Sequence, residues 1–140
     1  MYRYCAGLIS AVICCCYFSC ATKQKTKKVN VQHLLKSWRM AELVIGNEYQ
    51  PINPFMSITF TEQGKWITNE KGKTQEGRWE IDEYKGTLTL QNQQVSTILH
   101  LSDSLLVLKT KATNGQEVRI SYVPDHEKDY DFWRKKIRKR

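Results

Sequence analysis

The sequence predicts an all-β protein, an eight-stranded antiparallel up-and-down barrel in which neighbouring strands in sequence pair with each other. Three observations support this prediction. Between residues 37 and 123 apolar residues recur at every second position, as in strands with one buried and one exposed face. The segments between these runs are short and turn-like, so they leave no room for parallel crossovers. Closing such a meander into a barrel also removes its exposed edges.

The first 20 residues have the layout of an export signal. Arg3 is the only charge, residues 5–18 are uncharged and mostly apolar, and the small Ser19 precedes Cys20. This order resembles a bacterial lipoprotein signal, in which the last cysteine carries fatty-acyl chains such as palmitate. We therefore expect a signal peptide over residues 1–19 and lipidation at Cys20. Two alternatives stay open: a membrane span over the 18 uncharged residues 4–21, and an ordinary cleaved signal.

All five cysteines lie at or before position 20, which argues against several kinds of site in the rest of the chain. A disulfide framework would distribute cysteines through the domain that it staples. His33, His100 and His126 are far apart and lack the spacing of zinc ligands. We therefore expect no metal and no cofactor.

The charge is concentrated at the two ends of the chain. The net charge is +8, yet residues 29–133 carry 11 basic and 14 acidic residues, a net of −3. The lysines that follow Cys20 lie in a polar tether, expected over residues 20–30, and could attract anionic headgroups. No acidic residue follows Cys20 directly, and by similarity to bacterial lipoproteins this favours the periplasmic face of the outer membrane. Export also argues against a nucleic-acid partner.

The barrel is expected over residues 31–124. The stretch "VQHLLKS" predicts a helical turn, with Leu34 and Leu35 closing one end. The strands read, in order, SWRMAEL, MSITFTE, KWITNE, GRWEIDE, TLTLQN, VSTILHL, LLVLKTKA and QEVRISYV. Asn114 and Gly115 predict a type I′ turn, which needs positive φ at both central residues. The longest connection, residues 46–55, contains two prolines and is expected to arch over the other end.

After Pro124 the alternation stops, and residues 125–140 predict an amphipathic basic C-terminal helix. Tyr130, Trp133 and Ile137 form a helical apolar stripe, and the segment ends in "RKKIRKR". Acidic residues early and basic residues late match the helix dipole. Such a helix packs on the barrel wall or lies on a membrane or partner surface, and the sequence leaves both interpretations open.

Several short motifs resemble the lipocalin-like domains of small Bacteroidota lipoproteins. "LLKSW" resembles a Gly-x-Trp motif at the first strand, with Lys36 at the glycine position, and "GRWEI" matches a second Gly-x-Trp at the fourth strand. "ITFTEQGKW" resembles a Phe-x-x-x-Gly hairpin, and two Leu-x-Leu pairs follow. The resemblance covers residues 31–123. It implies an eight-stranded calyx and a lipid-anchored envelope location, often with no known ligand.

An eight-stranded barrel has an interior just large enough for packed side chains or one small ligand. The inward residues expected to contact a ligand are Trp38, Met40, Phe60, Trp66, Trp79 and Tyr122. We favour a protein that binds a small apolar molecule. The alternative is a filled barrel that serves as a non-enzymatic subunit of a cell-envelope complex. Catalysis has little support, because Glu80 and Asp82 alternate with apolar residues and so belong to a solvated strand face.

Overall fold

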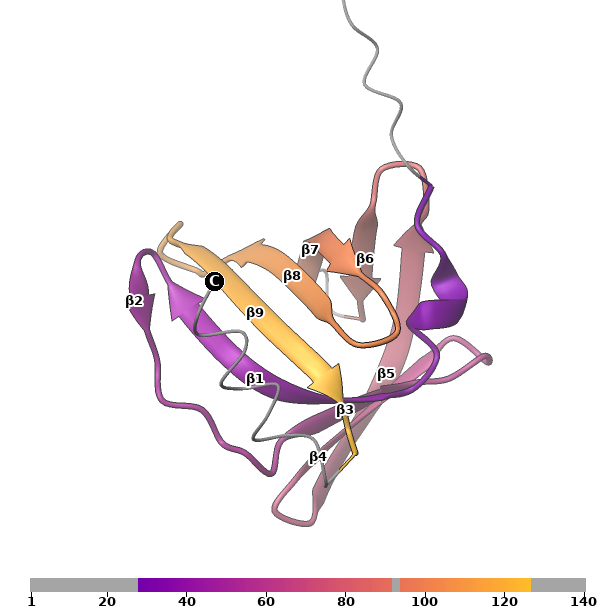
Figure 1. Cartoon of the computed structure of the whole chain (residues 1–140), viewed down its shortest axis with the longest axis horizontal. Coiled ribbons are helices and arrows are strands. Elements are labelled where there is room, and N and C mark those ends of the chain that lie inside the picture. The colour runs from indigo at the N-terminus through magenta and orange to yellow at the C-terminus, as the bar shows by residue number, and fades with distance from the viewer. Residues whose placement is uncertain (1–27, 92–93, 127–140) are drawn as a thin grey trace, which may run out of the picture.

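In a computed structural model of the chain, residues 28–91 and 94–126 are described (Figure 1). They form one sheet that closes on itself into a barrel. The elements are η1 (Val31–His33), β1 (Ser37–Ile45), β2 (Glu48–Tyr49), β3 (Ser57–Phe60), β4 (Lys65–Glu70), β5 (Lys73–Asp82), β6 (Thr87–Leu90), β7 (Gln94–Leu101), β8 (Leu106–Lys111) and β9 (Glu117–Pro124). No helix in this part of the chain has the length and hydropathy needed to cross a bilayer.

The predicted eight-stranded antiparallel barrel is confirmed. Strands β3 to β9 each pair with the next along the chain, and β9 returns to β1, from Trp38 paired with Pro124 to Ile45 paired with Val118. The two-residue strand β2 was not predicted. It pairs with the end of β1, whereas β3 pairs with its beginning, so both lie along one edge of β1.

Several sequence predictions concern the two ends of the chain, which lie outside the described residues. These are the signal peptide, the lipidated Cys20 and nearly all of the C-terminal helix. The last part of the expected tether is described, and it contacts the barrel. The backbone N–H of Val29 donates to the carbonyl of Glu83 at 3.0 Å, and the Lys28 ammonium lies 2.8 Å from the Glu83 carboxylate.

The turn at Asn114 and Gly115 has a different type from the one that the sequence predicted. The Ala112 N–H donates to the Gln116 carbonyl at 2.9 Å, so three residues lie in that loop, and Gly115 has a φ of 81° while Asn114 is not among the positive-φ residues. The type I′ prediction at Asn114 and Gly115 is therefore wrong, because Thr113 lengthens the loop. Two successive positive φ values occur instead at Lys71 (49°) and Gly72 (81°), between β4 and β5.

Two β-bulges change which residues face the interior. In β1 the register shifts between Met40 and Glu42, and in β7 it shifts between Ile98 and His100. Each bulge adds one residue to its strand, so the residues beyond it exchange faces. Leu43 therefore faces inward, opposite Ile120, and Glu42 lies on the outer face.

The buried apolar cluster lies inside the barrel and includes Leu34, the residue directly after η1 (Figure 1 shows η1 beside the strands). Leu34 is completely buried in this core, as predicted, whereas Leu35 is half-buried. Two contacts hold η1 in place: the Asp103 carboxylate lies 2.7 Å from Nδ1 of His33 and 3.4 Å from Nζ of Lys36. The β7–β8 turn thus fixes the segment that closes the barrel.

Candidate ligand-binding site

The structure brings all six predicted ligand-contacting residues into one apolar cluster. Four of them are buried at its centre: Trp38, Met40, Phe60 and Tyr122. Trp66 and Trp79 pack against this centre and remain half-buried. The two groups therefore differ in accessibility, which strand alternation could not show.

Trp38 is part of the closed end of the barrel. Its side chain is fully buried, and its indole N–H donates to the Leu34 carbonyl at 3.0 Å. The Lys36 ammonium lies 5.4 Å from the centre of the indole ring, within the range of a cation–π contact. These contacts connect η1 to β1, and they identify Trp38 chiefly as a structural residue.

Tyr122 lies opposite Met40 in the ladder between β1 and β9 and is 8% exposed. Burial raises the pKa of its phenol from 10.0 to about 12, because a phenolate inside the barrel would lose its hydration. Tyr122 therefore stays neutral over the whole physiological range, and its ring contributes to an uncharged interior.

Trp66 lies directly over Gly77. The two residues are paired between β4 and β5, and a Cβ added to Gly77 would lie 2.7 Å from Cε2 and Cζ2 of the indole. Real Cβ atoms essentially never approach so closely. The glycine of the "GRW" motif is therefore required for the indole of the neighbouring strand to pack on the wall.

Trp79 packs against Phe60 and closes the same part of the wall. Their ring centroids are 5.9 Å apart and the ring planes cross at 88°, an edge-to-face arrangement. Trp79 follows Gly77 by two positions, so it shares its face, and it is paired with Leu90 on β6. Phe60, Trp66 and Trp79 thus form a continuous aromatic surface across β3, β4 and β5.

The indole N–H groups of Trp66 and Trp79 are both shielded from solvent, and neither has a hydrogen-bond partner within residues 28–91 and 94–126. A buried donor without a partner costs about 1–3 kcal/mol relative to one that is satisfied. Buried tryptophans ordinarily find such a partner, as Trp38 does with Leu34. Two unpaired donors on one aromatic surface are therefore the feature of this barrel that most needs an explanation.

Two inward polar residues were missed in the sequence analysis. Ser96 is paired with Leu88, and Thr110 with Val118, so both share the face of core residues, and both are buried. The Thr110 hydroxyl donates to the Val95 carbonyl at 3.2 Å. Ser96 lies two residues before Ile98, and Thr110 lies two residues after Leu108, so strand alternation alone would have placed both on the inner face.

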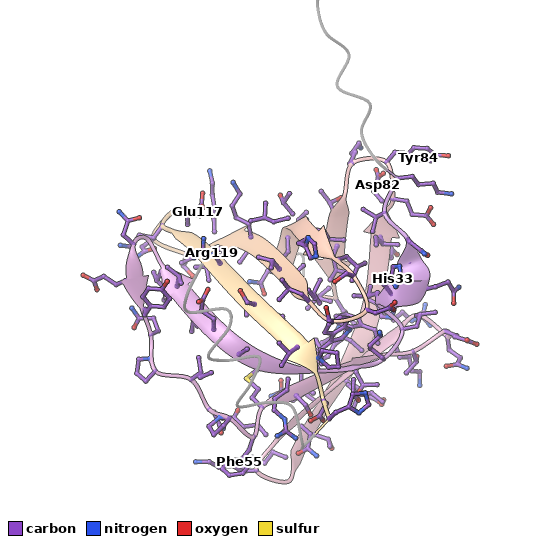
Figure 2. The ribbon with its side chains drawn as sticks, in the orientation of Figure 1. His33, Phe55, Asp82, Tyr84, Glu117 and Arg119 are labelled. Atoms are coloured by element: carbon purple, nitrogen blue, oxygen red, sulfur yellow. The ribbon has the colours of Figure 1, made fainter. Side chains whose placement is uncertain are left out.

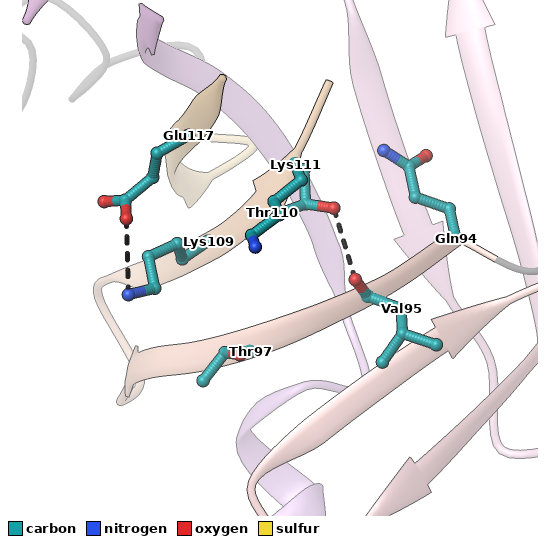
Figure 3. Close-up of a pocket in the computed structure, with 7 residues that line it drawn as sticks. All are labelled: Gln94, Val95, Thr97, Lys109, Thr110, Lys111 and Glu117. Atoms are coloured by element: carbon teal, nitrogen blue, oxygen red, sulfur yellow. Dashed lines mark hydrogen bonds and ion pairs between the residues drawn. The ribbon is translucent and has the colours of Figure 1, made fainter. Parts of the chain in front are cut away.

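Two solvent-open grooves lie on the barrel away from the aromatic cluster. One, of about 470 Å³, lies between β7 and β8 where their ladder ends at Thr97 and Lys109 (Figure 3). Lys109 at this groove pairs with Glu117 at 3.5 Å. A second groove, of about 400 Å³, is lined by residues that include Tyr49, Leu99 and Arg119. Both are open to solvent, and neither is lined by any of the six predicted ligand-contacting residues.

The titratable residues singled out in the sequence contact different partners, and Figure 2 labels two of them, His33 in η1 and Asp82 at the end of β5. His33 contacts Asp103, and Nε2 of His100 lies 3.3 Å from the Ser102 hydroxyl. Asp82 accepts backbone N–H bonds from Lys85 and Tyr84, and the bond from Lys85 is the largest cause of its lowered pKa. Within the described residues, no three His, Cys, Asp or Glu side chains come close enough to hold a metal ion.

No family model matches the chain, and no curated protein matches its sequence. Solved structures with a similar fold include a DUF4847 family protein from Bacteroides vulgatus, at 15% identity and a TM-score of 0.49, covering 65% of this chain and 93% of that one. An uncharacterized protein from Bacteroides eggerthii has 11% identity and a TM-score of 0.46, covering 63% and 98%.

A third similar structure is bovine odorant binding protein in complex with a selenium-containing odorant. It has 21% identity and a TM-score of 0.43, and the match covers 81% of this chain and 85% of that one. At these identities and TM-scores the likeness carries no information on function.

Proposed function

We propose that this chain is a lipid-anchored protein of the outer membrane, facing the periplasm, whose barrel binds one small apolar molecule without catalysis. The anchor would be Cys20, whose acyl chains would hold the barrel at the membrane surface. The membrane and the ligand are the partners that this proposal requires.

One observation carries the binding proposal: Trp66 and Trp79 face the inside of a closed barrel but remain half-buried. Leu43, Leu90 and Ile120 also pack against the core and are half-buried. Inward side chains that keep accessible area leave apolar surface for a ligand to cover, and burial of such surface contributes about 25 cal/mol per Å². A ligand that covered these residues would bind without displacing the packed centre.

The chemistry of the wall supports an apolar ligand. The cluster that lines the interior consists of aliphatic, aromatic and methionine side chains, and the phenol of Tyr122 is held neutral. A charged molecule would lose its hydration inside such a wall and gain no ion pair in return. An uncharged molecule of modest size fits this wall best.

The alternative role, an accessory subunit of an envelope complex, is favoured by a different observation. The centre of the barrel is densely packed, with Leu34, Trp38, Leu88 and Leu106 all fully buried. A barrel that is filled throughout would act through its outer surface, where Tyr49, Phe55 and Tyr84 are exposed. In this case the half-buried tryptophans would be part of the packing.

Native mass spectrometry of the protein purified from its own membranes would test the binding role. We expect a co-purified mass of a few hundred daltons that is released on unfolding. A clean peak for the ligand-free protein would count against the binder and in favour of the accessory subunit.

A cysteine substitution tests the anchor separately. The Cys20→Ser variant should lose the acyl masses and leave the membrane fraction, because Cys20 is the expected acylation point. The matched control is Cys15→Ser, which removes a sulfur from the apolar part of the signal and should leave acylation and fractionation unchanged. Retention of the Cys20→Ser protein in the membrane would overturn the proposed anchor.

A further inference from the structure

We infer that residues 127–140 of this chain cover the outer face of β1 and β9, with Tyr130, Trp133 and Ile137 against the barrel wall. The sequence left two surfaces open for this segment, the barrel wall and a membrane or partner, and the buried outer face of these two strands favours the wall. The inference concerns the outside of the barrel, so it is independent of the proposed ligand and of the proposed anchor.

The first step is the burial of side chains that point away from the core. Met40 and Tyr122 face each other inside the barrel, so the pairs Glu42 with Ser121 and Arg39 with Val123 lie on the outer face. Outward residues of a barrel are ordinarily in contact with water. Five outward residues of these two strands are nevertheless almost inaccessible: Val123 at 0%, Ala41 at 1%, Ser121 at 3%, Glu42 at 5% and Val44 at 6% exposure.

This burial is confined to one side of the barrel, where β1 and β9 run side by side (Figure 1). The outward residues Glu76, Arg78, Glu80, Thr97 and His100, on β5 and β7, are all exposed. The extensive contacts between described elements all join neighbours in the sheet, so no described strand or helix lies across β1 and β9. The cover must therefore come from another part of the chain or from another molecule.

The course of the chain favours its own C-terminal segment. The Asp125 N–H donates to the Ser37 carbonyl at 3.0 Å, and the His126 N–H donates to the Pro124 carbonyl at 2.8 Å. The second bond closes a three-residue turn, so the chain changes direction directly after β9. The N-terminal residues, by contrast, reach the described part at Lys28, beside the β5–β6 turn, on the other side of the sheet.

The segment has the length and the apolar residues that this face requires. Its 14 residues would extend about 21 Å as a helix, and the eight residues of β9 extend about 26 Å. Tyr130, Trp133 and Ile137 recur at helical spacing and form one apolar stripe. A helix that returned along β9 would place this stripe over Val123, Ala41 and Val44 and leave its basic residues toward water.

The charges along the face match those along such a segment. Arg39 lies opposite Val123, at the end where the chain leaves β9, and Glu117 begins β9 at the other end. The segment starts with three acidic residues between positions 127 and 131 and ends with six basic residues. A return along β9 brings opposite charges together at both ends, although Arg39 already pairs with Asp125, and Glu117 with Lys109.

Photo-crosslinking in the full-length protein tests the placement. Trp133 is replaced by the photoreactive residue p-benzoylphenylalanine, and the protein is irradiated in its own membranes. We expect the main adducts to be within the same chain, on peptides that contain residues 39–44 or 119–123. The matched control places the same residue at Lys135, about 200° around the helix, where adducts to this face should be absent.

Other products would overturn the inference. Predominant adducts to lipid would mean that the segment lies on the membrane, and adducts that join two chains would mean that a second copy covers the face. Equal yields on the barrel from positions 133 and 135 would mean that the stripe does not face the wall.

Thermal unfolding of simple variants provides a second measurement that does not depend on the photoreactive residue. Trp133→Ala removes the largest residue of the stripe and should lower Tm by roughly 4 °C or more. Lys135→Ala, on the opposite side of the helix, should leave Tm nearly unchanged. Equal Tm values for Trp133→Ala and the wild type would contradict the docking of this segment on the barrel.

Discussion

Replacing Gly77 by alanine should destabilise the barrel, because the new methyl group has no room beneath Trp66. It would lie 2.7 Å from Cε2 and Cζ2 of the indole and 2.8 Å from Nε1. These are ring atoms of a side chain held by its pairing with Gly77 on one side and Phe60 on the other, so the indole cannot move aside as a flexible chain would. Relief requires the whole ring to tilt or the two strands to separate.

The size of the effect follows from two opposing contributions. Overpacking a well-packed site costs about 1–3 kcal/mol. Alanine also restricts the unfolded chain, which returns about 0.4–1 kcal/mol where the backbone accepts it, and Gly77 is not among the positive-φ glycines. The net loss should be about 1–2 kcal/mol, which lowers Tm by roughly 4–16 °C in a domain of this size.

The assay is a double-mutant cycle measured by urea unfolding and circular dichroism. Gly77→Ala is made in the wild-type protein and in Trp66→Leu, which removes the indole. The methyl group should then cost close to nothing, because its collision partner is gone. Gly46→Ala is the control: Gly46 has a φ of 61° and no atom within 4 Å of its added Cβ, so its cost is backbone strain and should be equal in both backgrounds. An undiminished cost of Gly77→Ala in Trp66→Leu would refute the proposed collision.

Three further substitutions test other contacts. The pKa of Tyr122 is 10.0 in the unfolded chain and about 12 in the folded chain, so the neutral phenol stabilises the fold below pH 10.0 and this contribution is lost as the pH rises to 12. Over this pH range the free energy of unfolding, measured by urea titration, should fall by about 2–3 kcal/mol more in the wild type than in Tyr122→Phe. The hydrogen bond from His33 is the largest cause of the lowered pKa of Asp103, so the ionised carboxylate stabilises the fold above pH 3.8 and this contribution is lost as the pH falls through the folded pKa. In Asp103→Asn, Tm should therefore fall less steeply with decreasing pH in the acid range than it does in the wild type. An equal fall in the two proteins would contradict this. Trp38→Phe should lower the free energy of unfolding by about 1–3 kcal/mol, because it removes the buried hydrogen bond to the Leu34 carbonyl, which then accepts only from the Lys36 N–H, and leaves a gap where the indole was packed; an unchanged denaturation midpoint would argue against that bond.

Much of the fold was predictable because its signals are local. Alternation of apolar and polar residues decides which face of a strand is buried, and it placed Trp38, Phe60, Trp66 and Tyr122 correctly on the inner wall. The number of apolar runs and the shortness of the connections were enough for an antiparallel meander. The "GRW" motif is also visible in the sequence, whereas the reason that its glycine is needed, the indole of Trp66 above it, is visible only in the structure.

The bulges and the turn were missed for a common reason. A bulge is defined by two residues opposing one on the partner strand, so Ala41 and Leu99 look like ordinary strand residues until the register is known. The loop around Asn114 likewise depends on whether Thr113 belongs to the strand or to the turn, which the pairing of Ala112 with Gln116 decides.

The sequence by itself determined that the chain forms a meander of strands and which side of each strand is apolar, since both follow from the order of residues along one segment. The export signal over residues 1–19 and the lipidation of Cys20 stay predictions from the sequence. Only the tertiary structure decided that Trp38 is bonded and enclosed while Trp66 and Trp79 keep unpaired donors and accessible area. Those properties depend on atoms that other strands bring to the same place, and no pattern within a single strand records them.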